Sequence, residues 1–137
     1  MALQFYTAGK VKHAEKFRKL RDDLLLPVCA SWIDLPSVFD IKTVWPTCYE
    51  DVRHSNFVLL YCETFEEELR GALVEIGMAF GMNKPVYAIN TCKSLKVDAV
   101  SDVAFTHYKL WNWLESKTLH RGALEAMALY IKQRKGN

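Results

Sequence analysis

The sequence predicts an α/β fold, in which a single domain covering residues 1–137 is built on a doubly wound parallel sheet of five strands. Short apolar runs rich in β-branched and aromatic residues alternate with segments of helical periodicity along the chain. The run Asn56–Cys62 is apolar almost throughout, which is typical of a strand buried on both faces of a parallel sheet. The length of 137 residues suits one domain, and no linker or repeat divides the chain.

Five segments have the composition and length of strands. A glycine turn at Gly9 closes the first, and the pair Lys84-Pro85 precedes the fourth. Because strands alternate with helices, we expect βαβ crossovers that place helices on both faces of the sheet. The predicted strands are Leu3–Thr7, Val28–Trp32, Asn56–Cys62, Val86–Ile89 and Val103–Thr106.

Five further segments have helical signals. Apolar residues recur at helical spacing in the first, which ends before Pro27. Pro46 opens the second, because proline suits the first helical turn. The third is apolar on all sides, which is typical of a buried helix. The predicted helices are His13–Leu25, Pro46–His54, Gly71–Gly81, Tyr108–Glu115 and Leu119–Gln133, with long connections over Ile33–Trp45 and Asn90–Asp102.

The composition is that of an ordinary soluble globular protein, with 50% hydrophobic and 25% charged residues. The net charge of +2 gives no reason to expect binding to nucleic acid or to a membrane surface. The four cysteines form no C-x-x-C pair or zinc signature, and Cys29 and Cys62 lie in apolar runs as expected for buried free thiols. Free thiols indicate a reducing compartment, and no signal-peptide pattern begins the chain, so a cytoplasmic location is expected.

Glu75 is the only ionisable residue in the predicted buried segment Gly71–Met82. A lone carboxylate in apolar surroundings is costly unless it is hydrogen-bonded, paired or put to use. In a doubly wound sheet, ligands bind beyond the carboxyl ends of the strands, at the switch point of strand order. The loops expected there are Gly9–Lys12, Glu63–Arg70 and Asn90–Lys96, and Glu75 lies close enough to the start of its helix to reach that crevice.

Two opposite effects act on this carboxyl group. The helix N-terminus favours its ionised form, whereas apolar surroundings favour its neutral form. An ionised, poorly solvated carboxylate can act as a nucleophile, stabilise an oxocarbenium ion or serve as a general base. In the plainer interpretation, Glu75 hydrogen-bonds to a neighbouring loop or pairs with Arg70 or a lysine. The sequence alone leaves these alternatives open.

Basic residues follow the first predicted strand and precede the buried helix. Lys10 and Lys12 could bind a 5′-phosphate, but exposed loop lysines are usually only solvated. Arg70 could bind the same anion or pair with Glu75. The sequence therefore allows an anion site without requiring one.

Three other residues near the predicted crevice have two interpretations each. Trp32 and Trp45 could stack on a nucleobase, although packing in the core is the more frequent role of tryptophan. Asp34 could bind a sugar hydroxyl or a base edge, or could simply be a turn residue after a strand.

The segment Arg70–Ala79 has the sequence Arg-Gly-Ala-Leu-Val-Glu-Ile-Gly-Met-Ala and is followed by Gly81–Val86. It resembles the nucleoside 2-deoxyribosyltransferase-like superfamily, which includes 2′-deoxynucleoside 5′-phosphate N-hydrolase-like proteins. In that group a Glu-aliphatic-Gly-x-Ala motif follows the third strand, and a Gly-Lys-Pro-Val-like turn leads into the fourth. Phe5–Gly9 looks like the family's first strand, Ser31–Asp34 is similar to small members, and Asp51–Leu59 looks like the approach to the third strand.

The resemblance implies a flavodoxin-like fold and the cleavage or transfer of the N-glycosidic bond of a (deoxy)nucleoside or nucleotide. Glu75 would attack the anomeric carbon and form a covalent glycosyl-enzyme, which a second base or water then resolves. Tyr6 would hydrogen-bond to the nucleophile or the sugar, and Gly9 would let the backbone approach the ligand. Arg70 and Gly71 would belong to the substrate-binding segment.

The chain departs from the family at two positions. Family members often carry aspartates where this chain has Asn56 and Cys48. Asp51 could replace the acid that protonates the leaving base, although its spacing differs. Two other functions therefore stay open, namely an NAD glycohydrolase and a non-catalytic nucleotide-binding or sensor domain with an incomplete site. No metal or redox cofactor is indicated, since the chain has neither a P-loop nor a G-x-G-x-x-G motif.

A homodimer or a larger homo-oligomer is expected. One sheet layer cannot easily cover a helix that is apolar on all sides, so the side that carries Met78 and Met82 is predicted to meet a second subunit. Members of the family that the chain resembles are commonly dimers or larger, in agreement with this expectation.

Overall fold

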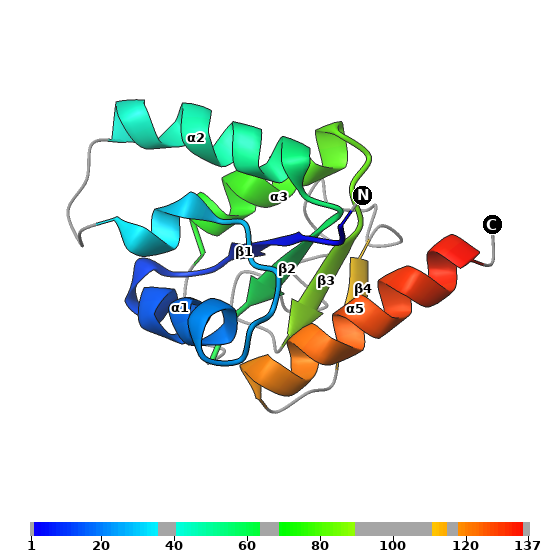
Figure 1. The fold of residues 1–137 in the computed structure, drawn as a ribbon. Coiled ribbons are helices and arrows are strands. Elements are labelled where there is room, and N and C mark those ends of the chain that lie inside the picture. Colours follow the sequence, from blue (N-terminus) through cyan, green and yellow to red (C-terminus); the bar gives the residue numbers. More distant parts are fainter. Residues whose placement is uncertain (1, 36–40, 64–68, 90–110, 115–117, 136–137) are drawn as a thin grey trace.

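The computed structural model describes residues 2–35, 41–63, 69–89, 111–114 and 118–135 (Figure 1). Strands and helices alternate, as in an α/β protein. In chain order the elements are β1 (Phe5–Ala8), the 3₁₀ turn η1 (Val11–His13), α1 (Ala14–Asp22), the 3₁₀ turn η2 (Ser31–Asp34), α2 (Ile41–His54), β2 (Phe57–Tyr61), α3 (Gly71–Gly81), β3 (Val86–Ile89), β4 (Trp111–Leu114) and α5 (Leu119–Lys135).

The four described strands form one parallel sheet in the order β1-β2-β3-β4. Figure 1 shows α2 and α3 over one face of this sheet and α1 and α5 over the other. Every residue of β1, β2 and β3 is buried, as expected for a parallel sheet that helices cover on both faces. The predicted α/β class and the parallel sheet are therefore confirmed, and α1, α3 and α5 lie within or close to their predicted ranges.

An aromatic cluster joins the sheet to α5. The rings of Phe5 and Phe57 stack with their centroids 5.2 Å apart, and Phe57 also contacts Tyr87 at 5.1 Å and Tyr130 of α5 at 5.5 Å. Because side chains alternate along a strand, the neighbours of these residues in sequence, such as Tyr6 in β1, face α2 and α3. The two faces of the sheet thus have different roles, and the face under α2 and α3 carries the site described below.

The prediction of a strand over Val28–Trp32 is wrong, because only Val28 pairs with β1, through a single bridge. Val28 forms one parallel bridge with Phe5, whose amide donates to the Pro27 carbonyl at 2.9 Å and whose carbonyl accepts from the Cys29 amide at 2.9 Å. The chain then turns into η2 instead of continuing along β1. The indole Nε1–H of Trp32 donates to the Thr7 carbonyl at 2.9 Å, so a side chain replaces the next backbone partner of the strand.

The C-terminal part of the sheet also differs from the prediction. The predicted strand Val103–Thr106 lies outside the described residues, so the described chain does not contain five strands. Trp111–Leu114, within the predicted helix Tyr108–Glu115, forms β4 and pairs in parallel with β3. Its sequence Trp-Asn-Trp-Leu alternates and is rich in aromatic residues, and pairing with β3 satisfies this strand tendency.

The second predicted helix begins earlier than expected. α2 starts at Ile41, and Pro46 lies inside it rather than at its first position. Proline near the start of a helix removes only one backbone hydrogen bond there, which the rest of a long helix tolerates. α2 therefore occupies the end of the predicted connection Ile33–Trp45, of which 36–40 lie outside the described residues.

The predicted free thiols are present in the described part of the chain. Cys29, Cys48 and Cys62 form no disulfide, and only Cys29 is partly exposed, while Cys92 lies outside the described residues. Burial raises the pKa of the Cys29 thiol to about 12. Within the described ranges, no helix has the length and apolar character needed to cross a membrane.

Candidate functional site

A cavity of about 720 Å³, here called the Glu75 pocket, lies beyond the carboxyl ends of β1 and β2. At this point the neighbours of β1 diverge, because Val28 lies on one side of the strand and β2 on the other. Loops after such strands are the usual ligand sites of open α/β sheets. Apolar side chains form most of the wall. The lining residues are Gly9, Lys10, Val11, Lys12, Trp32, Val44, Trp45, Cys48, Leu69, Arg70, Gly71, Val74 and Glu75.

Glu75 is buried at one side of this pocket, with only 5% of its surface exposed. It lies on the inner face of α3 with Ala72, Ile76 and Ala79. Its Oε2 atom has no hydrogen-bond partner among the described residues, and no described cation pairs with it. Burial alone raises the pKa of this carboxyl well above its ordinary value. The ion pair with Arg70 or a lysine that the sequence allowed is therefore not formed in the described structure.

Tyr6 is fully buried in β1. Its hydroxyl has no hydrogen-bond partner among the described residues, and strand alternation turns its side chain toward α2 and α3. β1 and α3 are in contact, so two unpartnered polar groups, the Tyr6 hydroxyl and the Glu75 carboxyl, lie on the same side of the sheet. Buried polar groups without partners are uncommon, and they concentrate where a protein binds a ligand or carries out chemistry.

Two tryptophans, Trp32 and Trp45, line the pocket. Trp32 is fixed by its hydrogen bond to Thr7 and by an edge contact with Phe17, whose ring centroid lies 5.6 Å away at an interplanar angle of 80°. Trp45 on α2 is half-buried, and its Cη2 atom would lie 3.5 Å from a Cβ atom placed on Gly71. Gly71, the first residue of α3, therefore lies next to the edge of the Trp45 ring, and a Cβ atom there would be in ordinary van der Waals contact with the indole.

Gly9 has a structural reason to be glycine. A Cβ atom there would lie 3.0 Å from the Tyr61 carbonyl oxygen and 3.2 Å from Cζ of Phe17. The backbone after β1 thus packs closely against its own core, and this close approach brings Lys10 and Lys12 to the pocket. With Arg70, the N-cap residue of α3, they give the Glu75 pocket three cationic side chains.

Asp51 and Asp34 do not line the pocket. Asp51 on α2 accepts a hydrogen bond from the Ser31 amide at 2.8 Å. Asp34 accepts two hydrogen bonds from the guanidinium of Arg21, at 2.7 and 2.9 Å, and these bonds lower the pKa of the Asp34 carboxyl. Both carboxylates thus contact residues at η2 in this arrangement, and the catalytic role of Asp51 and the ligand-binding role of Asp34 stay predictions.

Several pocket residues were not identified from the sequence as binding residues. Val44 and Cys48 lie one helical turn apart on the buried face of α2, and this spacing is a signal that could have placed them on one wall. Burial raises the pKa of the Cys48 thiol to about 11, so the thiol is neutral at physiological pH. Leu69 and Val74 complete the apolar lining, and nothing in their local sequence distinguishes them from core residues.

A polar cluster ties the loops after β1 and β2 together. The Glu63 carboxylate accepts hydrogen bonds from Lys16 and, at 2.6 Å, from the Tyr61 hydroxyl, and it lies 3.7 Å from Nδ1 of the buried His13. The hydrogen bond from Lys16, followed by that from Tyr61, lowers the pKa of Glu63. His13 ends η1, so this cluster helps to hold the segment that carries the pocket lysines. The described residues contain no group of three His, Cys, Asp or Glu side chains placed to bind a metal ion.

No model of a known protein family matches this chain, and no curated protein matches it either.

Proposed function

We propose that the protein cleaves or transfers the N-glycosidic bond of a (deoxy)nucleoside or nucleotide, with Glu75 as the nucleophile. One observation carries this proposal: a carboxyl group that is buried and unpartnered among the described residues opens onto a pocket with aromatic walls. A fold gains nothing in stability from such a group, because burial penalises its charge and no described partner offsets the penalty. Use in chemistry or ligand binding explains why it is present.

In the proposed step, ionised Glu75 attacks the anomeric carbon, and the C–N bond breaks with its electron pair leaving on the base. The base takes up a proton from solvent water, and a glycosyl ester of Glu75 remains. Water, or a second base, then attacks the same carbon and releases Glu75 as a carboxylate. The first outcome makes the protein a hydrolase and the second makes it a transferase. Tyr6, on the same side of the sheet, is proposed to hydrogen-bond to the carboxylate when it is ionised.

The pocket walls favour a substrate with an aromatic base and an anionic group. The indoles of Trp32 and Trp45 offer faces or edges for a nucleobase. Lys10, Lys12 and Arg70 offer cationic partners for a phosphate. We therefore propose a nucleotide as the preferred substrate, with an unphosphorylated nucleoside as the weaker one.

The sheet order supports a flavodoxin-like arrangement as part of the same proposal. The bridge at Val28 can be counted as a strand reduced to one residue on the outer side of β1. With the five strands then numbered along the chain, their order in the sheet is 2-1-3-4-5, which is that of flavodoxin-like doubly wound sheets. In this arrangement the Glu75 pocket lies at the switch point.

The direct test is to incubate the protein with a panel of nucleosides, deoxynucleoside 5′-phosphates and NAD, and to follow free base by chromatography. We expect base release from at least one deoxynucleotide, with the corresponding nucleoside turned over more slowly. Absence of base release from the whole panel, with and without a second base as acceptor, would contradict the proposed reaction.

Trp45→Ala is expected to raise KM for the nucleotide by roughly 10- to 100-fold, because stacking on an aromatic side chain contributes about 1–3 kcal/mol per base. Trp45→Phe keeps an aromatic face and should remain within about fivefold of wild type. Steady-state kinetics measures both variants, and a melting curve checks that each is folded. Equal KM values for the Ala and Phe variants would show that Trp45 is only a packing residue.

A second candidate is a non-catalytic nucleotide sensor, and Cys48 favours it. This thiol lines the pocket, and burial raises its pKa to about 11, so it is a much weaker proton donor than the carboxylic acid that the resembled family often carries there. Calorimetric binding of a nucleotide without base release over a long incubation would support the sensor. Nicotinamide release confined to NAD would instead support an NAD glycohydrolase.

We also propose a homo-oligomer. Met78 and Met82, which were expected to meet a second subunit, are half-buried against the core, and Val74 on the same helix is 49% exposed beside the pocket. Sedimentation of a monomer at micromolar concentration would remove this proposal.

A further inference from the structure

We propose that Asp51, Arg18 and the Arg21–Asp34 pair are positioning residues that hold η2 so that Trp32 forms a fixed wall of the Glu75 pocket. Trp32 is the residue of this four-residue turn that lines the pocket. An isolated 3₁₀ turn has weak internal hydrogen bonds and does not hold a side chain in one place by itself. Fixing such a turn requires contacts from its neighbours, and side chains of α1 and α2 supply them.

The first end of the turn is held by α2. The Ser31 amide, which starts η2, donates to Oδ2 of Asp51 at 2.8 Å. A carboxylate that accepts from an amide at the start of a turn satisfies a donor that the turn itself leaves open. Asp51 lies three residues beyond Cys48, which lines the pocket. The helix α2 therefore lines the pocket itself and also fixes the start of η2, which carries Trp32.

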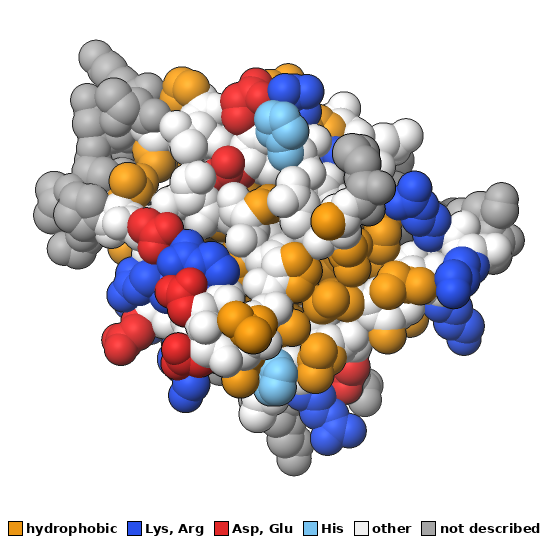
Figure 2. Space-filling view, viewed as in Figure 1, with side chains coloured by type: hydrophobic (Ala, Val, Ile, Leu, Met, Phe, Trp, Pro, Cys, Tyr) orange, Lys and Arg blue, Asp and Glu red, His pale blue; other side chains and the backbone are white. Residues whose placement is uncertain are grey.

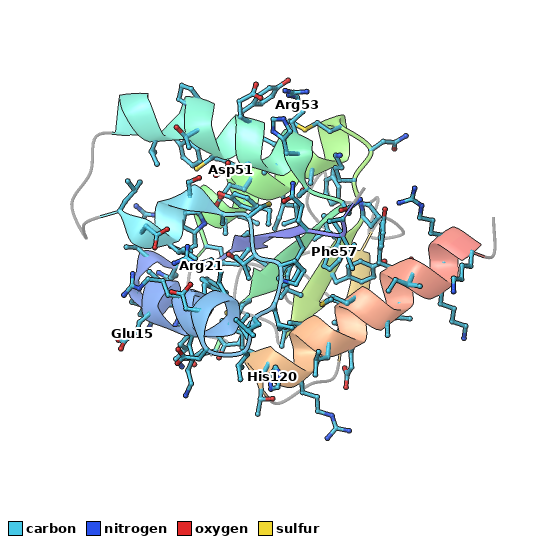
Figure 3. All side chains as sticks on the ribbon, in the orientation of Figure 1. Glu15, Arg21, Asp51, Arg53, Phe57 and His120 are labelled. Atoms are coloured by element: carbon cyan, nitrogen blue, oxygen red, sulfur yellow. The ribbon has the colours of Figure 1, made fainter. Side chains whose placement is uncertain are left out.

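The second end of the turn is held by α1. Arg18 donates from Nη1 to the Ile33 carbonyl at 2.5 Å, and Arg21 donates from Nη1 and Nη2 to the two carboxylate oxygens of Asp34, at 2.7 and 2.9 Å. Figure 3 shows Asp51 below α2 and Arg21 on α1, with η2 between them. In the same view, Figure 2 shows basic and acidic side chains close together over α1 and the neighbouring turn.

The indole of Trp32 is the third point of attachment. Its Nε1–H donates to Thr7 of β1 at 2.9 Å, and its ring meets the edge of Phe17 from α1. The turn is thus tied to β1, α1 and α2 together. A two-point guanidinium–carboxylate contact fixes direction as well as distance, which suits a role in orienting a wall. Exposed ion pairs contribute little to global stability, so the main effect of Arg21 and Asp34 is expected in the pocket.

The test measures hydrogen exchange of the Trp32 indole N–H by NMR, with the resonance assigned from its loss in Trp32→Phe. Asp51→Ala is expected to speed this exchange by about tenfold or more, as expected for the loss of a charge-assisted hydrogen bond. Asp51→Asn keeps an acceptor oxygen and should stay within about threefold of wild type. Glu50→Ala is the matched control, because Glu50 is an exposed carboxylate of the same helix that pairs with Arg53.

The second readout rests on the proposed function and uses the nucleotide of the panel that is turned over fastest. Asp51→Ala and Asp34→Ala should each raise its KM by about 5- to 20-fold and change kcat by less than about threefold, because they loosen a binding wall and not the nucleophile. Asp51→Asn should restore KM. Unchanged indole exchange in Asp51→Ala would show that Asp51 does not hold η2. Faster exchange with unchanged KM would show that the position of η2 does not matter for binding. If the variant exchanges faster but the wild-type protein releases no base, the positioning role of Asp51 stands and the proposed function is rejected.

Discussion

Glu75→Gln is expected to abolish base release while raising the melting temperature at pH 8. Glutamine has the shape of glutamate but cannot form a glycosyl ester, so we expect activity to fall by at least about 10³-fold. The same change replaces a buried carboxyl whose pKa burial raises with a group that stays neutral at pH 8, and each unit of that rise costs about 1.4 kcal/mol of stability at pH values above the folded-state pKa. A gain of about 1 kcal/mol corresponds to a rise of roughly 4 °C in a domain of this size.

The sign of the pH dependence follows from the raised pKa of Glu75. The folded state binds this proton more tightly than the unfolded state, in which the ordinary value is 4.5. The contribution of Glu75 to the free energy of unfolding is therefore fully present below pH 4.5, and it declines as the pH rises from there through the folded-state pKa. Activity should change in the opposite direction, because the nucleophile must be ionised, so base release should rise over the pH range in which stability falls.

Thermal melts and rates measured between pH 4 and 9 check both statements. Glu75→Gln should lose this part of the pH dependence of stability. Glu125→Gln is a suitable control, since Glu125 forms an exposed pair with Arg121 on α5 and should leave the melting temperature and the rate nearly unchanged. A Glu75→Gln protein that is less stable than wild type at pH 8 would show that the carboxylate has a stabilising partner.

Gly122→Ala is expected to destabilise the protein by about 1–3 kcal/mol, although alanine is the better helix former. A Cβ atom at Gly122 would lie 2.2 Å from Cδ1 and 2.5 Å from Cγ1 of Ile89. Ile89 is fully buried in β3, so its side chain cannot move aside without disturbing the packing around it. α5 would have to move away from the sheet, and urea denaturation measures the resulting loss of free energy of unfolding.

Gly77→Ala on α3 is the matched control. Nothing lies within 4 Å of a Cβ atom at Gly77, which is exposed, so this substitution should stabilise the protein by about 0.5–1 kcal/mol. Adding Ile89→Ala to Gly122→Ala removes the three atoms that the new methyl group meets. The double-mutant cycle should then give a favourable coupling of about 1 kcal/mol or more. Equal effects of alanine at the two glycines would mean that α5 does not pack closely on β3.

Local sequence patterns predicted the elements whose apolar residues alone identify them as a strand or a helix. β2 and α3 were found because an apolar run and a helix apolar on all sides are unambiguous signals, and the place of Glu75 followed from them. A pocket role for Trp32 was one of two interpretations, and the strand predicted to carry it is instead the turn η2. The turn at Ser31 depends on partners in α1 and α2 that are distant in sequence.

The same cause explains why the contacts of Asp51 and Asp34 could not be predicted. Both are acidic residues near a predicted crevice, and only their contacts, with the Ser31 amide and with Arg21, distinguish a structural carboxylate from a catalytic one. β4 was missed because pairing with β3 determines its conformation, and this pairing is not a property of the segment alone. Local periodicity thus predicts which segments are buried, whereas contacts between distant residues decide what an individual polar side chain does.

The hydrogen bond from Trp32 to the Thr7 carbonyl also bears on how the protein avoids aggregation through the edge of its sheet. Where the strand at Val28 stops, the outer backbone groups of β1 would otherwise be open to a strand from another molecule, which is a route to aggregation. The indole N–H occupies the Thr7 carbonyl, which is thereby closed to another strand. A side chain that forms part of the pocket wall therefore also blocks intermolecular strand addition, so loss of this tryptophan should increase light scattering on storage even where the fold survives.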